Sequence, residues 1–194
     1  MKDTVIVFAR VPRLGTVKRR LARGIGDRAA LRFHSRTLDR LVRALARERR
    51  FRTCLATTPA RAWMPLPAGL AMRIDQGRGD VGQRMHRAFA RFGRRRVVLL
   101  GCDIPAAGAA DVLAAFRALG SADAVFGPAT DGGYWLVGMG PRRPAHPFAC
   151  CRWSTPHALE DTLRNFRHRR VTTLRTLSDV DTADDYRRLQ AADE

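Results

Sequence analysis

An apolar run that ends in an acid constrains the fold of this chain more than any other segment. Residues 97–100 are Val-Val-Leu-Leu, and Gly101-Cys102-Asp103-Ile104-Pro105 follows directly. Four aliphatic residues without polar alternation are typical of a strand buried on both faces of a parallel sheet, because helices cover both of its sides. Asp103 then lies just past the carboxyl end of that strand, where open α/β sheets bind their ligands. Position alone favours two roles equally: a ligand for a metal or substrate, or a cap for the following turn or helix.

The remaining segments alternate between strand and helix patterns. β-Branched and apolar runs predict strands at 4–9, 51–57, 70–74, 122–126, 134–137 and 171–174. Three- and four-residue apolar spacing predicts a helix from Asp27 to about Arg50, and further helices at 85–92 and 109–119. Helix-capping residues at 153–156 and 179–185 predict the start of two further helices. At 194 residues, the chain fits one domain over residues 1–194.

The formal net charge of +18 is the strongest compositional bias. It suggests a polyanionic partner such as a nucleic acid. However, only Lys2 and Lys18 among the 36 basic residues are lysines, and a bias toward arginine would produce the same charge without selection for binding. No zinc-finger spacing, aromatic-interleaved basic stripe or RNA-binding motif accompanies the charge, so we expect no specific nucleic-acid binding. The charge does favour anionic small molecules such as nucleotides and sugar phosphates.

The cysteine spacing and the hydropathy of the chain indicate the redox state of its thiols and its cellular location. Cys54, Cys102, Cys150 and Cys151 lack the paired spacing of a zinc site, so reduced thiols are expected and zinc is not. No apolar segment is long enough to span a membrane, and the run at 4–9 is too short for the core of a signal peptide. We therefore expect a cytoplasmic protein. The oligomeric state, including a homodimer, stays open.

A cationic loop follows the first predicted strand. Pro12 and Gly15 end the strand and force an irregular path, which places Arg10, Lys18 and Arg20 near the strand end. Backbone N–H groups and cations that converge in such a loop suit a polyphosphate, although the glycine spacing is neither that of a Walker loop nor that of a dinucleotide fingerprint. A solvated basic turn is the alternative.

A glycine-rich loop follows the third predicted strand, in the segment 75–85. Three glycines, at positions 77, 79 and 82, predict a loop that a ligand or another backbone approaches closely. Gln76 at its start could bind a nucleobase edge with its paired donor and acceptor, or be an ordinary loop amide.

Further acids follow later predicted strands. Asp131-Gly132-Gly133 predicts a tight turn that leads into the strand at 134–137. Asp179 and Asp181 precede the last predicted helix. Because they lie before its first turn, helix capping explains them poorly, and they could face a cation.

Taken in order, these segments resemble a bacterial family of glycosyltransferase-A-like proteins. The family is labelled radical-SAM/selenodomain-associated or arsenosugar-type transferases, and is related to the nucleotidyltransferases that act on molybdenum cofactor and on phospholactate. The resemblance covers essentially the whole chain. Five motifs carry it: Phe8-Ala9-Arg10-x-Pro12-x-x-Gly15-x-x-Lys18-x-Arg20-Leu21, Gln76-x-x-x-Asp80-x-Gly82-x-Arg84-Met85, Gly101-x-Asp103-x-Pro105, Gly127-Pro128-x-x-Asp131-Gly132-Gly133-Tyr134-x-Leu136 and Asp179-x-Asp181-Thr182.

The resemblance implies a three-layer, Rossmann-like α/β fold of the nucleotide-diphospho-sugar transferase type, with a mostly parallel central sheet. It also implies a nucleoside di- or triphosphate in the cleft and a divalent cation, Mg²⁺ or Mn²⁺. Asp103 and Asp181 would bind the cation, and Asp131 would serve the acceptor. Arg19 and Cys102 depart from the family pattern. The implied nucleotide-binding residues are Ala9, Arg10, Gly15, Lys18, Arg20, Gln76 and Asp80.

These residues favour a metal-dependent transferase that uses a nucleotide-sugar or NTP donor and a small-molecule acceptor. A cation and basic side chains would neutralise the charge that develops on a departing diphosphate, and Asp131 could orient or deprotonate the acceptor. The expected catalytic residues are Asp103, Asp131 and Lys18. The family label places glycosyl transfer ahead of nucleotidyl transfer to a small phosphorylated acceptor. A non-catalytic, basic nucleic-acid-binding protein is the alternative from another class.

Overall fold

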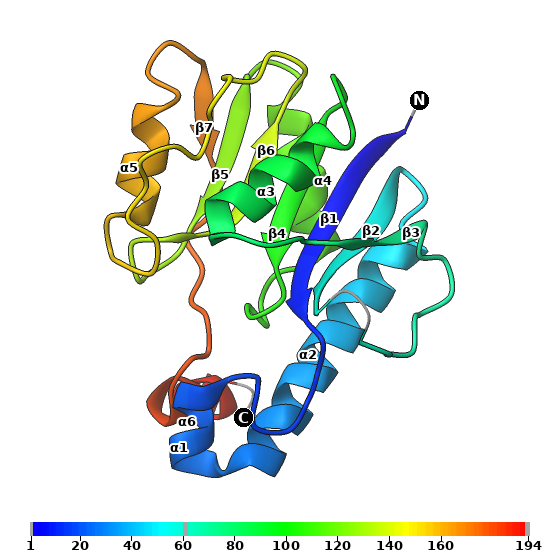
Figure 1. Ribbon diagram of the computed structural model, residues 1–194, viewed down its shortest axis with the longest axis vertical. Helices are drawn as coiled ribbons and strands as arrows, with labels where there is room; N and C mark the ends of the chain where they lie inside the picture. The colour runs from blue at the N-terminus through cyan, green and yellow to red at the C-terminus, as the bar shows by residue number, and fades with distance from the viewer. Residues whose placement is uncertain (1, 60–61, 193–194) are drawn as a thin grey trace.

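The computed structural model describes residues 2–59 and 62–192 and is built around a seven-stranded sheet (Figure 1). The strand order is β3-β2-β1-β4-β6-β5-β7. Only β6 runs antiparallel to its neighbours β4 and β5, and the other pairs are parallel. The strands are β1 (Asp3–Arg10), β2 (Phe51–Thr58), β3 (Met72–Asp75), β4 (Val97–Gly101), β5 (Ala124–Pro128), β6 (Tyr134–Met139) and β7 (Val171–Thr173). The prediction of a mostly parallel α/β sheet is confirmed.

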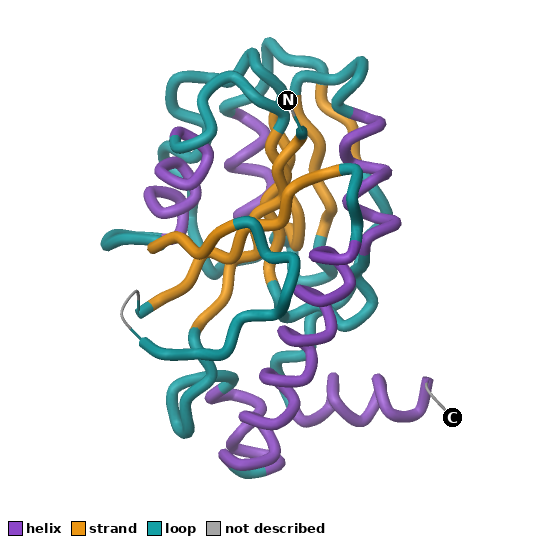
Figure 2. Tube along the Cα trace, turned by 90° about the vertical axis from the view of Figure 1, so that its right-hand side faces the viewer, coloured by secondary structure: helices purple, strands orange, loops and turns teal. Residues whose placement is uncertain are grey.

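Helices cover both faces of the sheet and give the predicted three layers (Figure 2). The structure has α1 (Arg19–Ile25), α2 (Asp27–Arg47), α3 (Val81–Ala90), α4 (Ala109–Ala118), α5 (Ala158–Arg164) and α6 (Ala183–Ala192). Side chains of α2 and α4 share one apolar cluster with the sheet, and side chains of α3 and α5 share another. None of the helices among residues 2–59 and 62–192 combines the length and apolarity needed to cross a membrane.

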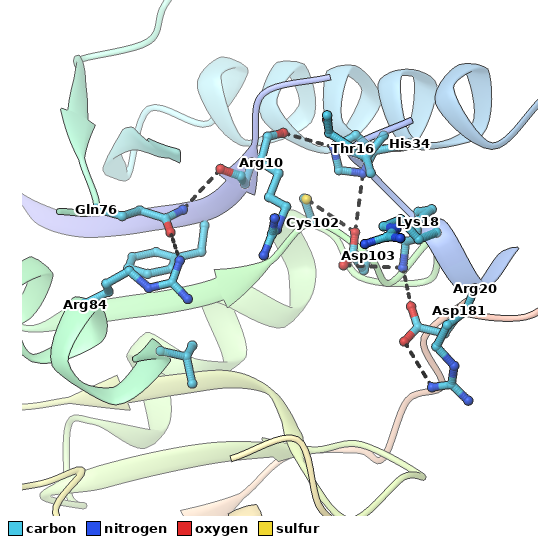
Figure 3. Close-up of a pocket in the computed structure, with 15 residues that line it drawn as sticks. Arg10, Thr16, Lys18, Arg20, His34, Gln76, Arg84, Cys102, Asp103 and Asp181 are labelled. Carbon is cyan, nitrogen blue, oxygen red and sulfur yellow. Dashed lines mark hydrogen bonds and ion pairs between the residues drawn. The ribbon is translucent and has the colours of Figure 1, made fainter. Parts of the chain in front are cut away.

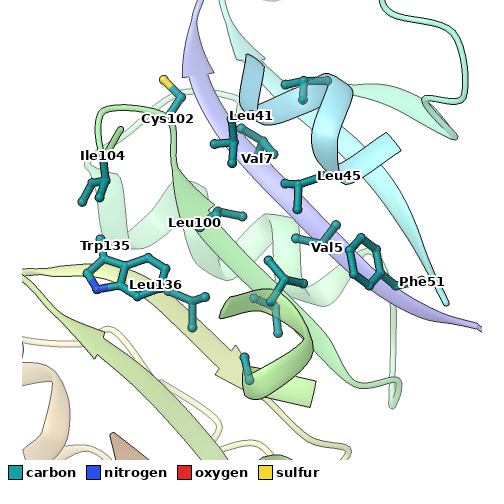
Figure 4. Close-up of a cluster of buried hydrophobic side chains, with 14 of the residues drawn as sticks. Val5, Val7, Leu41, Leu45, Phe51, Leu100, Cys102, Ile104, Trp135 and Leu136 are labelled. Carbon is teal, nitrogen blue, oxygen red and sulfur yellow. The ribbon is translucent and has the colours of Figure 1, made fainter. Parts of the chain in front are cut away.

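The periodicity of α2 explains why this long helix lies on the sheet. Its buried residues Leu38, Leu41, Val42 and Leu45 recur at three- and four-residue intervals and form one apolar face, as the sequence predicts. This face contacts the central strands in the cluster that also holds Leu100 (Figure 4). Burying each such aliphatic side chain contributes roughly 1.5–3 kcal/mol, so the contact fixes α2 against the sheet.

The strand order reverses direction between β1 and β4. Phe8 pairs with Gly101 near the carboxyl ends of these parallel strands, so the segments after Arg10 and after Gly101 leave the sheet side by side. Such a switch point is where open α/β sheets bind ligands, because the two outgoing loops diverge and leave a crevice. The fold thus places the cationic loop next to Asp103.

A helical lobe lies beyond this end of the sheet. The amino-terminal part of α2 packs with α1 and α6 around Leu21, Ala30 and Val180. An extended segment after β7 leads down to α6, which lies beside α1 (Figure 1). Pro12 and Gly15 predict an irregular loop in this region, and α1 is not predicted. This helix has only seven residues, and tertiary packing in the lobe supports it more than its own periodicity.

Candidate functional site

A pocket of about 510 Å³ lies at the switch point between β1 and β4 (Figure 3). We call it the switch-point pocket. It gathers the ends of both strands, the loop before α1, one residue of α2 and the start of α3. Its lining residues are Phe8, Ala9, Arg10, Thr16, Val17, Lys18, Arg19, Arg20, His34, Gln76, Val81, Arg84, Cys102, Asp103 and Asp181. Seven of the predicted site residues are therefore brought together: Ala9, Arg10, Lys18, Arg20, Gln76, Asp103 and Asp181.

Lys18 lies at the centre of the charged groups. Its ammonium is 2.7 Å from Asp181 Oδ1 and 3.3 Å from Asp103 Oδ2, and its side chain is only 4% exposed. The backbone of Lys18 has φ 48° and ψ 45°, a left-handed conformation that costs a non-glycine residue roughly 1–3 kcal/mol. The chain turns at Lys18 into α1, and from this position the Lys18 ammonium contacts both acids.

Opposite charges determine the ionisation of this group. Burial alone would lower the pKa of Lys18, but the attraction of Asp103 and Asp181 outweighs it and raises the pKa above 10.5. Desolvation alone would raise the pKa of Asp103, but a proton on His34 Nδ1, 3.6 Å away, and the Lys18 ammonium would outweigh it and hold that pKa well below its ordinary value. Lys18 is therefore charged, and so is Asp103, over the physiological pH range.

The predicted cation ligands Asp103 and Asp181 do not face each other across an open space. The Lys18 ammonium lies between them and contacts an oxygen of each. A cation held jointly by both carboxylates at this position would have to displace a buried ammonium. The geometry therefore does not fit the predicted pairing of Asp103 with Asp181 as metal ligands.

A second group of cations lies on the other side of the pocket. The guanidinium of Arg84 donates to Gln76 Oε1 at 3.1 Å, and Figure 3 shows Arg10 between this pair and Asp103. Burial, together with the nearby charges of Arg10 and Arg87, lowers the pKa of Arg84. Like charges that crowd at a partly buried position are relieved by an anion, so this side of the pocket suits phosphate groups.

The side-chain amide of Gln76 is hydrogen-bonded within the protein. Its amide nitrogen donates to the carbonyl oxygens of Ala9, at 3.1 Å, and Ala56, at 2.8 Å. These two bonds use both amide hydrogens, and the side chain is buried. Gln76 therefore ties the strand ends together and orients Arg84, and it has no free donor with which to bind a nucleobase edge.

Two predicted nucleotide-binding residues lie outside the pocket lining. Asp80 is the N-cap of α3: its side chain accepts from Gln83 N, and Gln83 in turn accepts from Asp80 N. This capping box explains the acid without a ligand. Gly15 lies in the turn before α1 with φ +71°, a conformation that glycine adopts readily. Both residues shape the loops rather than line the pocket.

Asp131 lies at a neighbouring pocket of about 680 Å³, which we call the acidic pocket. Asp131 Oδ1 accepts from Gly133 N at 2.9 Å, so the predicted tight turn is confirmed. Asp179, Asp181 and Arg20 line the same pocket, and the last two also line the switch-point pocket. The two pockets are therefore adjacent, with Asp103 in the lining of the first and Asp131 in the lining of the second.

His34 and Arg84 are the site residues that the sequence analysis missed. The sequence predicts a long helix here without distinguishing His34, whose side chain is 4% exposed and faces the pocket. Its position one turn before Leu38 on the buried face of α2 was the available signal, because that face continues to the strand ends. Arg84 is part of one of the motifs that carry the family resemblance, but its spacing from the other residues predicts no role for its side chain.

Asp179→Asn is expected to stabilise the protein above about pH 6. Burial, then the charges of Asp181 and Asp131, raises the pKa of Asp179 to about 6. The folded state therefore binds this proton more tightly than the unfolded state, and stability falls as the pH rises from about 4 through 6. Asparagine does not ionise, so the variant should gain about 2–4 °C in unfolding midpoint at pH 8 and nothing at pH 4. Thermal unfolding across this pH range measures the gain.

The matched control for Asp179→Asn is Asp184→Asn, since Asp184 lines the same pocket but is 70% exposed. We expect no pH-dependent gain from it. An equal gain for Asp179→Asn at pH 4 and pH 8 would contradict the electrostatic explanation.

Solved structures of similar proteins agree with the fold. A candidate nucleotide-diphospho-sugar transferase from Desulfovibrio desulfuricans G20 matches with a TM-score of 0.91 and 29% identity, over 100% of this chain and 89% of that chain. The complex of Rv0371C with manganese, from Mycobacterium tuberculosis H37Rv, matches with a TM-score of 0.53 and 22% identity, over 97% of each chain. A 4-diphosphocytidyl-2C-methyl-D-erythritol synthase from Anaerococcus prevotii DSM 20548 matches with a TM-score of 0.62 and 10% identity, over 98% and 97%.

The last two likenesses show the fold alone. All three share the fold of this chain, and the first is described as a candidate nucleotide-diphospho-sugar transferase. Among curated proteins, no match was found. Residues 37–155, more than half of the chain, match the family described as an uncharacterized protein conserved in bacteria (DUF2064), and the chain therefore belongs to that family.

Proposed function

We propose that this protein is a transferase that takes a nucleotide donor into the switch-point pocket and transfers a group from it to a small acceptor. The convergence of Lys18, Arg10 and Arg84 with Asp103 at the switch point carries the proposal. Cations that converge on one pocket suit a di- or triphosphate, and a half-exposed carboxylate among them suits the divalent cation that accompanies such a ligand. A nucleotide-diphospho-sugar is the favoured donor, because the relative from Desulfovibrio desulfuricans is described as a candidate transferase of that class.

The basic residues would divide the work of holding the donor. Arg10 and Arg84 would bind phosphate oxygens on one side of the pocket. Lys18 and the exposed Arg20 would lie on the other side, where Asp181 contacts both. Positioned cations that are already in place stabilise the charge developing on a departing diphosphate without reorganisation, which is the main electrostatic task in this class of reaction.

Asp103 fits a divalent cation on one of its two oxygens. Lys18 lies on the Oδ2 side, whereas Oδ1 accepts a hydrogen bond from the Cys102 thiol, at 3.5 Å, and lies 3.6 Å from His34 Nδ1. An ionised carboxylate with one oxygen left for a ligand is a suitable donor for Mg²⁺ or Mn²⁺. The cation would supply charge neutralisation at the diphosphate. The manganese bound to the distantly similar Rv0371C supports this assignment.

The acidic pocket would hold the acceptor in this proposal. It adjoins the switch-point pocket through Asp181 and Arg20, so an acceptor there would lie beside the donor. Asp131, at the rim, would orient or deprotonate the acceptor hydroxyl. We also propose a place for the chain among the radical-SAM-associated or arsenosugar-type transferases, on the basis of its motif order.

Nucleotidyl transfer from an NTP is the second candidate. The fold likeness to a 4-diphosphocytidyl-2C-methyl-D-erythritol synthase favours it, and the same cations would then stabilise a departing pyrophosphate. Product analysis separates the two reactions, because glycosyl transfer releases a nucleoside phosphate and nucleotidyl transfer releases pyrophosphate.

We expect a nucleotide donor to raise the unfolding midpoint in the presence of Mn²⁺. Ligand at one hundred times its Kd stabilises the folded state by about 2.7 kcal/mol, which corresponds to several degrees in a protein of this size. The measurement is thermal unfolding with UDP-, GDP- and ADP-sugars and with the four NTPs. The shift should shrink in high salt, since the contacts are ionic.

Single-stranded and double-stranded oligonucleotides are the control for the basic surface. A donor-specific shift that is lost in Arg84→Ala supports the proposal, because Arg84 lies in the pocket. Tight oligonucleotide binding with no shift from any nucleotide would favour the basic nucleic-acid-binding alternative instead.

A further inference from the structure

His34 is a buried histidine on α2 whose two ring nitrogens have different surroundings. Nε2 lies 3.0 Å from the carbonyl oxygen of Arg10. A carbonyl oxygen only accepts, so Nε2 donates its hydrogen and the neutral ring has its lone pair on Nδ1. Nδ1 is buried and has no hydrogen-bond partner among the described residues. Buried polar atoms are seldom left unpaired in folded proteins, so this nitrogen calls for a ligand.

The unpaired nitrogen faces Asp103. Nδ1 is 3.6 Å from Asp103 Oδ1, too far for a hydrogen bond. A lone pair and a carboxylate oxygen repel each other unless a positive species lies between them. Two donors at about 2.1 Å from one ion are about 3.0 Å apart at the octahedral angle and about 3.4 Å apart at the tetrahedral angle, so a small approach of the two side chains would let both bind one ion. Cys102 Sγ completes a group of three donor atoms within 4.8 Å of one another.

Two contacts around this pair are those expected at a metal site. Metal-bound histidines usually donate their other ring N–H to a carbonyl or carboxylate, which fixes the ring orientation, and His34 donates to Arg10 in this way. Lys18 contacts the opposite oxygen of Asp103, so a cation on Oδ1 would not displace the ammonium. Figure 3 shows His34 and Lys18 approaching Asp103 from different sides.

We propose that His34 Nδ1 and Asp103 Oδ1 bind a divalent transition-metal cation in preference to Mg²⁺. Imidazole nitrogen is a good ligand for transition metals, whereas Mg²⁺ takes oxygen ligands and keeps several of its waters. This inference rests on the proposed function only in that the cation is the one that accompanies the nucleotide. The competing explanation is a proton on Nδ1, which would make His34 and Asp103 an ion pair.

Mn²⁺ alone, without nucleotide, is the probe. We expect wild type to bind Mn²⁺ at least about tenfold more tightly than Mg²⁺ in a competition titration. Pulsed electron paramagnetic resonance of the Mn²⁺ complex should show coupling to a ¹⁴N nucleus. His34→Gln replaces the ring nitrogen by an amide and should lower Mn²⁺ affinity about 10- to 100-fold, abolish the ¹⁴N coupling and change Mg²⁺ affinity less.

His168→Gln is the matched control, because His168 is an exposed histidine in the turn after α5. It should keep wild-type affinity and coupling. Circular dichroism and the unfolding midpoint establish that His34→Gln is folded, and the wild-type spectrum decides the question without any variant. A wild-type Mn²⁺ complex without ¹⁴N coupling, or equal affinity for Mg²⁺, would overturn the proposal in favour of the proton. Nucleotide-dependent thermal shifts test the proposed function separately, so either can fail while the other stands.

Discussion

Asp103→Asn is expected to lower the rate of group transfer by about a thousandfold or more. Asparagine keeps the size of the side chain but removes the negative charge that a cation on Oδ1 would need and that attracts Lys18 on Oδ2. Both consequences weaken charge stabilisation at the departing diphosphate, and the loss of one preorganised electrostatic contact already costs about 100- to 1,000-fold. The measurement is kcat/KM with the donor that the thermal-shift panel identifies, followed by release of its nucleoside phosphate or pyrophosphate.

Asp39→Asn is the control for that experiment. Asp39 is an aspartate on α2 that is 52% exposed and pairs with Arg43, so its loss should leave the rate unchanged. The unfolding midpoint of Asp103→Asn, measured without ligand, establishes that the variant is folded. Wild-type kcat/KM in Asp103→Asn would rule out the transferase mechanism proposed for this pocket.

The fold could be predicted because buried strands and amphipathic helices have opposite periodicities. The uninterrupted runs at β1 and β4 indicated strands covered on both faces, and the structure places them at the centre of the sheet. The spacing of Leu38, Leu41 and Leu45 likewise predicted the contact face of α2. Element ends were less exact: α2 stops at Arg47 rather than near Arg50, and β3 starts at Met72 rather than at residue 70.

The candidate site could be predicted only where backbone topology determines position. Loops after parallel strands meet at one edge of the sheet, so Arg10, Lys18 and Asp103 were correctly expected in one place. Side-chain contacts between distant segments were not accessible in this way. The pairing of Gln76 with Ala9 and Ala56, and the position of Lys18 between two acids, depend on packing that no spacing encodes.

The roles of His34 and Asp80 depend on three-dimensional contacts that the sequence does not show. His34 was missed because nothing in its spacing distinguishes it from the other residues of a long packing helix. Asp80 was expected at the nucleotide because of the family resemblance, although Asp80 and Gln83 form a capping box. In both cases the local pattern has a common structural explanation, and only the three-dimensional surroundings decide which explanation holds.

Lys18→Met is expected to reduce both donor binding and stability. Methionine is similar in length but leaves Asp103 and Asp181 without the ammonium between them. We expect donor affinity to fall about 10- to 100-fold, since a buried cation in the phosphate site is lost. The free energy of unfolding at pH 7 should fall by about 1–3 kcal/mol, because removing one partner leaves charges uncompensated while solvent screens these partly exposed acids. Lys2→Met is the matched control, because Lys2 is the other lysine of the chain and is exposed.

The pH dependence of that stability loss identifies its cause. The raised pKa of Lys18 stabilises the folded state fully below about pH 10.5 and loses this effect as the pH rises through the raised value. The lowered pKa of Asp103 stabilises the folded state above about pH 4 and loses this effect as the pH falls toward the lowered value. The difference in unfolding free energy between wild type and Lys18→Met should therefore be constant from about pH 5 to 9 and shrink at both extremes. Urea unfolding at intervals across this range measures it. A difference that persists undiminished at the acid extreme would instead assign the loss to packing of the Lys18 stem, because packing does not depend on the charge of Asp103.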